Sequence, residues 1–350
     1  MPRLSPKKEW RASAPCRVDL GGTLDLPLFY YTLGDGLAST FNMALDLRTE
    51  ILLKPFEKGK TAIASRGFSP AVFPNGKAPY NHPMGLVFAM LDAFGAGDLS
   101  LEIHSASPPR SSLGGSSVLS VALVALLMGI SGELSAEDLS DEKRAEIVLR
   151  AWNLESAITR VPGGMQDYLA AAYGGVHHWE WLRGDGGLPW RKREIFHVED
   201  YPAFSSCVLL AYCGDPHDSI QANERSIQGY FSGESRADWE RIAFLSRGFS
   251  EALSSWNFEK AISSMNEELD IRLRLTPDIL DAAGKEFVRA ARGLSCGARF
   301  TGAGGGGCVW ALGTADKIIS LRKIWEDVAE LFPGACVLDA HLEMRGVILS

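Results

Sequence analysis

Two stretches among the first hundred or so residues, 45–51 and 99–104, alternate strictly between two kinds of side chain. One kind is apolar or β-branched and the other is Asp, Arg, Glu, Ser or His, and this period of two is typical of a strand with one buried face. Residues 55–83 are rich in Gly, Pro, Lys and Ser, which predicts turns and short hairpins. The N-terminal part of the chain is therefore expected to form a sheet.

Three helices are predicted next. Residues 118–130 form an apolar run after two serines, and they are fewer than the roughly 20 residues that span a bilayer, so the run predicts a buried helix and no membrane partner. A second helix is expected over residues 140–158. A third is expected over residues 167–173, where Gly174 and Gly175 would end it.

The second half of the chain mixes strands and helices without a strict alternation, which favours an α+β fold over a doubly wound sheet. The polar, turn-rich segment 182–202 is the best candidate for a boundary, and it predicts one domain over residues 1–190 and another over 200–350. The elements expected after the boundary are a strand at 207–212, long helices up to about residue 292, a glycine-rich loop between two short strands, a helix at about 314–332 and a strand at 335–338.

Composition and charge exclude several classes of protein. The chain has 350 residues, 46% hydrophobic and 22% charged, which excludes a disordered or collagen-like protein. Its formal net charge of −8 argues against a broad basic surface, so no nucleic-acid partner is expected. The N-terminus lacks the apolar core of a signal peptide, and the six cysteines form no C-x-x-C pair, so a cytoplasmic protein with reduced core thiols is expected.

The 36 glycines are concentrated in a few clusters, and the first candidate site is residues 107–117, SPPRSSLGGSS. Small residues let a ligand approach the backbone, and the helix start offers unpaired N–H groups, so an anion site, most naturally for phosphate, is one interpretation. The hydroxyls of Ser116 and Ser117 would then bind phosphate or Mg²⁺. An ordinary loop with a serine N-cap is the other interpretation. The segment is not a Walker loop, because the lysine of that motif is missing.

The second cluster is FTGAGGGGC, residues 300–308. Gly302, Gly304 and Gly307 fit the G-x-G-x-x-G pattern of a dinucleotide site. That motif should open a helix, whereas residues 309–312 predict a strand. A loop that closes over a ligand or brings two elements together is therefore favoured, and a nucleotide-dependent dehydrogenase is kept as an alternative.

Two carboxylates and one arginine have suggestive positions. Glu155 lies at the edge of the buried face of its helix, where a carboxylate is unfavourable unless it is paired or holds a metal. Asp167 is expected at a helix start, where the helix dipole favours its ionised form. A surface-tilted glutamate and a simple N-cap are the alternatives. Arg17 and Asp25 flank a glycine pair and suit a polyhydroxyl or phosphorylated ligand, or else form a weak surface ion pair.

Four segments, taken together and in this order, resemble the GHMP kinase superfamily. The features most similar to the sugar-1-kinase branch of D-glycero-D-manno-heptose 7-phosphate kinase and fucokinase are Asp25-Leu-Pro27, the turn from Gly214 to Ser219 and the MNEEL of residues 265–269. Arg110 and Ser112 stand where the family usually has glycine, and Gly115 where it has Ser or Thr. The four segments are APCRVDLGGTLDL (14–26), PPRSSLGGSSV (108–118), GGMQDYLAAAYGG (163–175) and FTGAGGGGCVWAL (300–312).

The resemblance implies a fold and an activity. The fold would be α+β, with an N-terminal domain like domain 2 of ribosomal protein S5 and a ferredoxin-like C-terminal domain that carries the loop 301–307. The activity would be transfer of the γ-phosphate of ATP, with Mg²⁺, to a hydroxyl of a sugar or sugar phosphate, most naturally the anomeric one. Galactose, fucose, an isoprenoid alcohol or an amino-acid alcohol are alternative acceptors, and an inactive binding protein with the same fold is a further alternative.

The resemblance also implies roles for individual residues. Asp167 would be the general base or the electrostatic anchor for the acceptor hydroxyl, assisted by Arg17. Asp25 and Gly164 would contact the sugar together with Asp167. Glu155 and Ser116 would bind Mg²⁺, with Ser117 as a near alternative to Ser116. The residues expected to bind ATP are Ser107, Arg110, Ser111, Ser112, Gly114, Gly115, Ser116 and Ser117.

Overall fold

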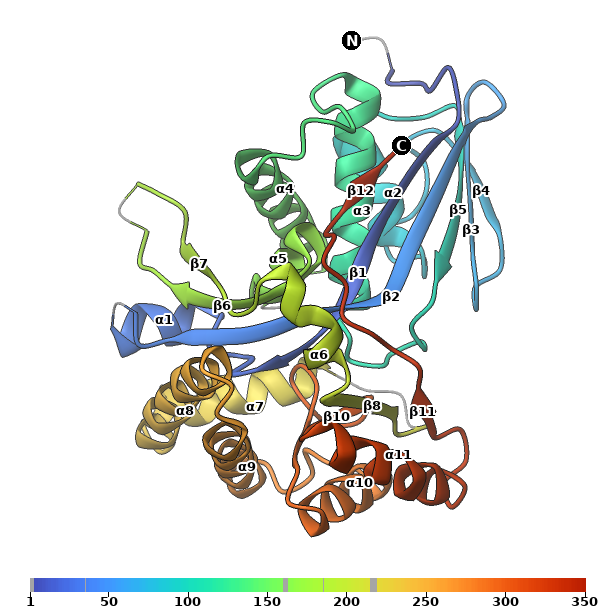
Figure 1. The fold of residues 1–350 in the computed structure, drawn as a ribbon. Helices are drawn as coiled ribbons and strands as arrows, with labels where there is room; N and C mark the ends of the chain where they lie inside the picture. Colours follow the sequence, from blue (N-terminus) through green and yellow to red (C-terminus); the bar gives the residue numbers. More distant parts are fainter. Residues whose placement is uncertain (1–2, 35, 160–162, 185, 215–218) are drawn as a thin grey trace.

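Helices and strands are mixed along the chain, and the strands form two separate sheets in the computed structural model (Figure 1). Within these sheets every described strand pair is antiparallel except one, and this confirms the predicted α+β class. The structure describes residues 3–34, 36–159, 163–184, 186–214 and 219–350.

The long strand β2 (Ser39–Pro55) organises the larger sheet. Its 17 residues are enough to pair with three strands: β1 (Trp10–Leu20) along most of its length, β5 (Leu99–Ser105) over one half and β6 (Val176–Trp181) over the other. Strand β2 therefore brings β1, β5 and β6 into one sheet, although these three strands lie far apart in sequence. Its other strands are β3 (Lys60–Ser65), β4 (Ala71–Pro74), β7 (Trp190–Glu194) and β12 (Ile348–Leu349).

The smaller sheet is made by the C-terminal half of the chain and lies at the lower end of the molecule in Figure 1. All five residues of its strand β10 are buried, because α10 and α11 cover the sheet. Its described strands follow the order β11 (Cys336–Leu338), β8 (Val208–Tyr212), β10 (Cys308–Leu312) and β9 (Gly297–Phe300).

Helices cover both sheets, and none of those within the described residues is both long and apolar enough to cross a membrane. The helices are α1 (Pro27–Leu33), α2 (Gly85–Ala93), α3 (Gly115–Ser131), α4 (Asp141–Thr159), α5 (Gln166–Tyr173), α6 (Tyr201–Ser205), α7 (Ser219–Ser232), α8 (Arg236–Ser254), α9 (Phe258–Leu275), α10 (Ala282–Gly293) and α11 (Ala315–Ala329), with a 3₁₀ turn at Val198–Asp200.

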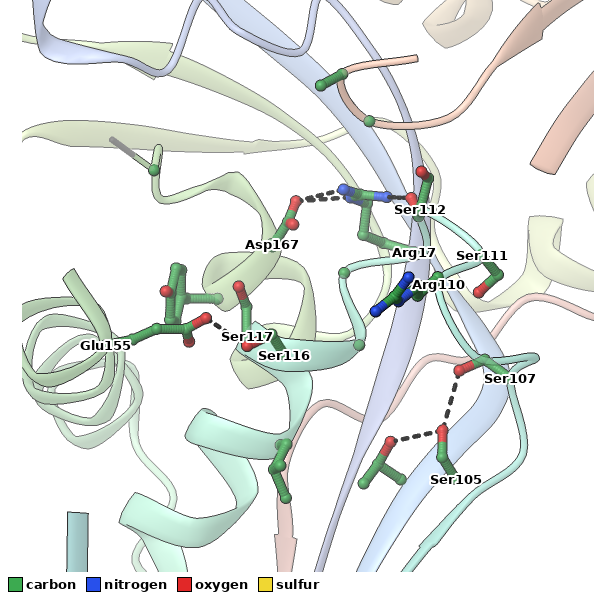
Figure 2. A pocket seen from close by; sticks show the side chains of 18 of the residues that line it. Arg17, Ser105, Ser107, Arg110, Ser111, Ser112, Ser116, Ser117, Glu155 and Asp167 are labelled. Atoms are coloured by element: carbon green, nitrogen blue, oxygen red, sulfur yellow. Dashed lines mark hydrogen bonds and ion pairs between the residues drawn. The ribbon is translucent and has the colours of Figure 1, made fainter. Parts of the chain in front are cut away.

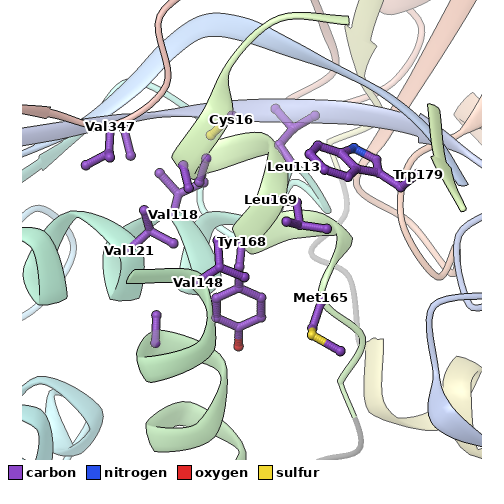
Figure 3. Close-up of a cluster of buried hydrophobic side chains, with 14 of the residues drawn as sticks. Cys16, Leu113, Val118, Val121, Val148, Met165, Tyr168, Leu169, Trp179 and Val347 are labelled. Carbon is purple, nitrogen blue, oxygen red and sulfur yellow. The ribbon is translucent and has the colours of Figure 1, made fainter. Parts of the chain in front are cut away.

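The core around α3 fixes the elements that carry the candidate site. Most residues of α3 are buried, because the helix is apolar all round, and it packs on β1, α4 and α5. Figure 3 shows Val118 and Val121 of α3 close to Val148 of α4 and Leu169 of α5. The N-termini of α3 and α5 are thereby held by the same apolar cluster.

The predicted elements are largely confirmed. The two alternating stretches lie within β2 and β5, the turn-rich segment between them forms the β3–β4 hairpin, and the three N-terminal helices are α3, α4 and α5. The predicted strand-loop-strand at the second glycine cluster is β9 and β10, followed by α11 and β11. Helix α2 was not predicted. Gly174 ends α5 as expected, with φ +70°.

Two expectations need correction. The segment 182–202 contains β7, the 3₁₀ turn and α6, so it is more structured than its polar composition indicates, and Trp190 is buried where β7 pairs with β6. All six cysteines are free, but Cys336 is exposed on the edge strand β11, so the expectation of core thiols is wrong for this residue. The division into domains at 1–190 and 200–350 stays a prediction.

Candidate functional site

A cavity of about 820 Å³ brings the four motif segments together. Its wall is formed by the end of β1, the loop before α3, the facing sides of α4 and α5, and the loop after β9; Figure 2 shows part of it. The sequence-predicted residues that line it are Arg17, Asp25, Ser107, Arg110, Ser111, Ser112, Gly114, Gly115, Ser116, Ser117, Glu155, Gly164 and Asp167. None of the predicted site residues is left outside this cavity.

Asp167 and Arg17 form an ion pair at one end of the cavity (Figure 2). Arg17 comes from β1 and is buried, and its Nε and Nη2 each lie 2.7 Å from Asp167 Oδ1. Its Nη1 donates to the carbonyl of Ser112 at 2.7 Å, so one guanidinium links the acidic residue to the glycine–serine loop. The alternative of a weak surface ion pair between Arg17 and Asp25 is therefore wrong.

Burial and the neighbouring charges together determine the pKa shifts of Asp167 and Arg17. Burial raises the pKa of Asp167, while the Arg17 guanidinium opposes that rise. Desolvation lowers the pKa of Arg17, but Asp167 and Asp19 raise it by more, so the guanidinium stays charged. The carboxylate side chain of Asp167 remains 24% exposed, which leaves it accessible from the cavity.

Asp25 lies beside this pair and is buried, and its Oδ2 accepts the backbone N–H of Gln166 at 3.0 Å. Burial raises the pKa of Asp25 to about 7. A Cβ on Gly164 would lie 1.7 Å from Asp25 Oδ2, so only glycine allows the backbone to pass this carboxylate. Gly164 is therefore placed next to Asp25, as the sequence predicted.

Glu155 lies at the other side of the cavity and is held by hydroxyl groups. Ser116 Oγ donates to its Oε1 at 2.5 Å and Ser120 Oγ to its Oε2 at 2.6 Å. Burial raises the pKa of Glu155, and the hydrogen bonds from Ser116, Ser120 and Tyr168 oppose that rise. Since Glu155 is buried, the alternative of a surface-tilted glutamate is wrong.

The two adjacent serines at the start of α3 differ. Ser116 is exposed toward the cavity and bonds to Glu155, whereas Ser117 is buried and its hydroxyl bonds to Tyr168. Mg²⁺ prefers oxygen ligands and usually combines one or two carboxylates with substrate phosphates and water. Glu155 and Ser116 fit such a partial site. Within the described part of the chain there is no cluster of three or more His, Cys, Asp or Glu side chains that would hold a metal by itself.

Two residues of the loop before α3 have a backbone conformation that favours glycine. Arg110 has φ +54° and Ser112 φ +61°, so both adopt the left-handed conformation that glycine tolerates best. Each such residue is strained by about 1–2 kcal/mol. Gly114, the N-cap of α3, has φ +79°, and a Cβ there would lie 3.2 Å from Asp167 Oδ2. The loop and the acidic residue are thus packed directly against each other.

The second glycine cluster is a packing loop. A Cβ on Gly307 would lie 2.7 Å from the carbonyl oxygen of Ser111, so this loop approaches the first one closely. The strand β10 follows it, as expected, and the helix that a dinucleotide motif requires is absent there.

Sequence reasoning missed three charged residues behind the site: Asp19, Glu268 and Arg299, all fully buried. Asp19 lies inside the first motif and Glu268 inside the MNEEL segment. Both segments were quoted from the sequence, but no function was assigned to either residue. The turn from Gly214 to Ser219 lies mostly outside the described residues.

Comparison with known proteins gives a family match and a shared fold. Residues 81–175 match the family model "GHMP kinases N terminal domain", which covers the stretch from α2 to the end of α5. No curated protein sequence matches the chain.

Solved structures agree with this chain over nearly its whole length. Galactokinase of Lactococcus lactis, solved with galactose, has a TM-score of 0.73 at 18% identity, over 97% of this chain and 95% of that one. A D-glycero-D-manno-heptose 1-phosphate kinase of Bacteriodes thetaiotaomicron has 0.72 at 14%, over 97% and 98%. The mevalonate kinase of Methanococcus jannaschii has 0.71 at 17%, over 95% and 98%. At these identities the likeness establishes the fold, and with the family match it confirms the resemblance stated above.

Proposed function

We propose that the chain is a kinase of the GHMP superfamily and that it transfers the γ-phosphate of ATP to a hydroxyl of a sugar or sugar phosphate, at the anomeric position. The observation that carries the proposal is the cavity itself. It combines an acid–arginine pair, a helix N-terminus and a carboxylate–hydroxyl pair in one space. Phosphoryl transfer depends mainly on positioning and charge neutralisation, and these groups supply both.

The acceptor hydroxyl would bind at Asp167. Arg17 occupies Oδ1 of this carboxylate with two bonds, so Oδ2 is the oxygen that would accept a hydrogen bond from the acceptor. Because burial raises the pKa of Asp167, its proton affinity is closer to that of a useful general base than for an exposed aspartate. Arg17 would hold the carboxylate in place while the proton moves to Oδ2.

The phosphates of ATP would bind to the loop before α3. Backbone N–H groups at a helix N-terminus, together with the positive end of the helix dipole, favour an anion there. Glu155 and Ser116 would hold Mg²⁺, which supplies charge neutralisation for the phosphates when it is bound. Ser116 is preferred over Ser117 because only Ser116 faces Glu155 from an exposed position.

The wall around Asp25 favours an acceptor with several hydroxyls. Thr23 and Gln166 line the cavity there, and Thr23 Oγ1 and Gln166 Oε1 are buried polar atoms that have no hydrogen-bond partner among the described residues. Such atoms cost about 1–3 kcal/mol when they stay unpaired. Thr23 is also β-branched at φ +79°, a strained conformation of the kind that concentrates at functional sites. A polyhydroxylated acceptor would satisfy this wall better than an isoprenoid alcohol.

An acceptor panel tests the proposal. ADP release from ATP and Mg²⁺ is measured with D-galactose, L-fucose, D-mannose and D-glycero-D-manno-heptose 7-phosphate, and with mevalonate and L-homoserine. We expect turnover with at least one of the four sugars. Turnover with mevalonate or homoserine alone would refute the sugar acceptor and leave the kinase, whereas no ADP release with any acceptor would refute the kinase as well.

A further inference from the structure

Five buried or half-buried charged side chains of alternating sign run from the C-terminal half of the chain to the acceptor site. In order they are Glu268, Arg299, Asp19, Arg17 and Asp167. Glu268 is on α9 and Arg299 on β9, whereas Asp19 and Arg17 are on β1. The side chains of Glu268, Arg299 and Asp19 have no exposed surface, so water does not screen these three charges.

Each step of this row is a close contact. Arg299 forms a fork on Glu268, with Nε–Oε2 at 3.0 Å and Nη2–Oε1 at 3.1 Å. Its third nitrogen, Nη1, donates to the Asp19 carbonyl at 2.7 Å and lies 3.3 Å from Asp19 Oδ2. Asp19 Oδ1 in turn lies 3.7 Å from Arg17 Nη1.

Asp19 also holds the second glycine-rich loop. The backbone N–H of Gly302 donates to Asp19 Oδ1 at 2.6 Å. Gly302 itself is so close to the site that a Cβ there would lie 3.3 Å from Arg17 Nη2 and from the carbonyl oxygen of Ser112. One carboxylate therefore accepts a hydrogen bond from this loop and lies at ion-pair distance from the guanidinium that binds Asp167.

The arrangement is costly to bury and is not needed for packing alone. Replacing a buried ion row by apolar residues is often neutral or stabilising, so stability is a weak reason for its presence. Its geometric effect is specific, because Arg299 approaches Asp19 Oδ2 while Gly302 and Arg17 lie at Oδ1. The rotation of the Asp19 carboxylate is thereby fixed from both sides.

We propose that Asp19 is a positioning residue for phosphoryl transfer, and that Glu268 and Arg299 hold its carboxylate so that Arg17 and the 301–307 loop stay aligned with Asp167. The inference rests on the proposed kinase activity. Asp19, Glu268 and Arg299 act through Arg17, since Arg17 and Gly302 separate them from the acceptor side of the cavity.

The adjacent glutamates of α9 provide a matched pair of variants. Glu267 also forms a fork with an arginine, Arg241, but this pair is exposed. We expect Glu268→Gln to lower kcat for the accepted sugar at least tenfold, with KM for ATP changed less than threefold. Glu267→Gln should leave both constants unchanged. Rates are taken per folded protein, well below the melting temperature of each variant.

A double-mutant cycle separates positioning from a purely structural role. Arg17→Lys, Arg299→Lys and the double variant are compared by kcat. If Arg299 acts through Arg17, the double variant should be no more than about threefold slower than Arg17→Lys alone, because neighbours in one network do not add. Arg299→Lys keeps the charge, so it serves as the second variant should Glu268→Gln not fold.

Three outcomes decide the matter. Additive losses in the cycle, or a lower melting temperature with unchanged kcat for both Glu268→Gln and Arg299→Lys, would overturn the positioning role while leaving the kinase intact. Non-additive losses confined to kcat would support it. Absence of ADP release by the unaltered protein with every acceptor would overturn the proposed function and this inference together.

Discussion

Asp167 and Glu155 are two carboxylates that line one cavity, and burial raises the pKa of both. Their partners differ. Asp167 is held at one oxygen by a guanidinium, whereas both oxygens of Glu155 accept hydroxyl hydrogen bonds. An arginine leaves the second oxygen of Asp167 available and offsets its charge. The serines satisfy Glu155 without neutralising it.

The two environments suit the same type of side chain to two different roles. Burial raises the pKa of Glu155, and among the described residues no cation pairs with it, so a bound cation would stabilise its ionised form. This suits Glu155 to Mg²⁺. A carboxylate already paired with arginine binds a second cation less well, but it can orient a hydroxyl and take its proton. Variants that remove each carboxyl charge should therefore give different kinetic defects.

The largest effect is expected for Asp167→Asn. The amide cannot accept the proton of the acceptor, so kcat should fall by about 10³-fold, within the range of general-base catalysis. The measurement is steady-state ADP release at saturating ATP, Mg²⁺ and acceptor. Asp327→Asn, an exposed aspartate on α11, is the control and should be unchanged. A kcat within tenfold of the unaltered protein would remove Asp167 from the reaction.

Glu155→Gln should instead act on the Mg²⁺ requirement. The amide keeps the size of the side chain but loses its charge, so the Mg²⁺ concentration for half-maximal rate should rise about 10- to 100-fold. Rates are measured across a Mg²⁺ titration, with Glu142→Gln on the same helix as the exposed control. An unchanged Mg²⁺ titration curve for Glu155→Gln would contradict the role of Glu155 in holding Mg²⁺, and with it the difference between Glu155 and Asp167.

Local sequence patterns predicted the helices and strands, but they did not predict which of these elements contact one another. The period of two in β2 and the apolar run of α3 follow from local patterning, and both were predicted. The partner of Arg17 was not, because Asp167 lies 150 residues away along the chain. Only the pairing of β1 with β2, and the packing of α5 beneath them, bring the two together.

In the glycine-rich segments, too, the sequence predicted one property and not another. Their small residues predicted close approach, and the contacts at Gly164 and Gly307 confirm it. The left-handed conformations of Arg110 and Ser112 could not be predicted, since these residue types ordinarily avoid them. Nor does a local pattern mark Arg299, which becomes part of the site only through β9 and the loop that follows.

Substitution of the two serines at the start of α3 tests which of them acts together with Glu155. Ser116→Ala removes the hydroxyl that faces the cavity, so KM for the ATP–Mg²⁺ complex should rise about three- to tenfold, the worth of one hydrogen bond. Ser117→Ala removes a buried hydroxyl bonded to Tyr168, so it should lower the melting temperature with a smaller change in KM. The reverse pattern would assign Ser117 to the metal.

Asp25 is a further carboxylate of the cavity, and among the described residues it forms no ion pair with a side chain of opposite charge. Burial raises its pKa in the folded protein to about 7, above the ordinary value of 3.8 for an aspartate. Between these values the folded state keeps a proton that the unfolded state has lost. Asp25 therefore reduces stability progressively as the pH rises through this window, and its full penalty applies above it.

Asp25→Asn removes that penalty, because the amide cannot ionise while its carbonyl can still accept the Gln166 N–H. The variant should melt higher than the unaltered protein at pH 8, by about 2 °C or more, and the gain should shrink toward pH 5. Thermal unfolding without ligand at several pH values gives this difference directly, and Asp327→Asn should show none. A gain that is constant with pH, or larger at pH 5, would mean that this carboxylate is not the uncompensated charge its burial indicates.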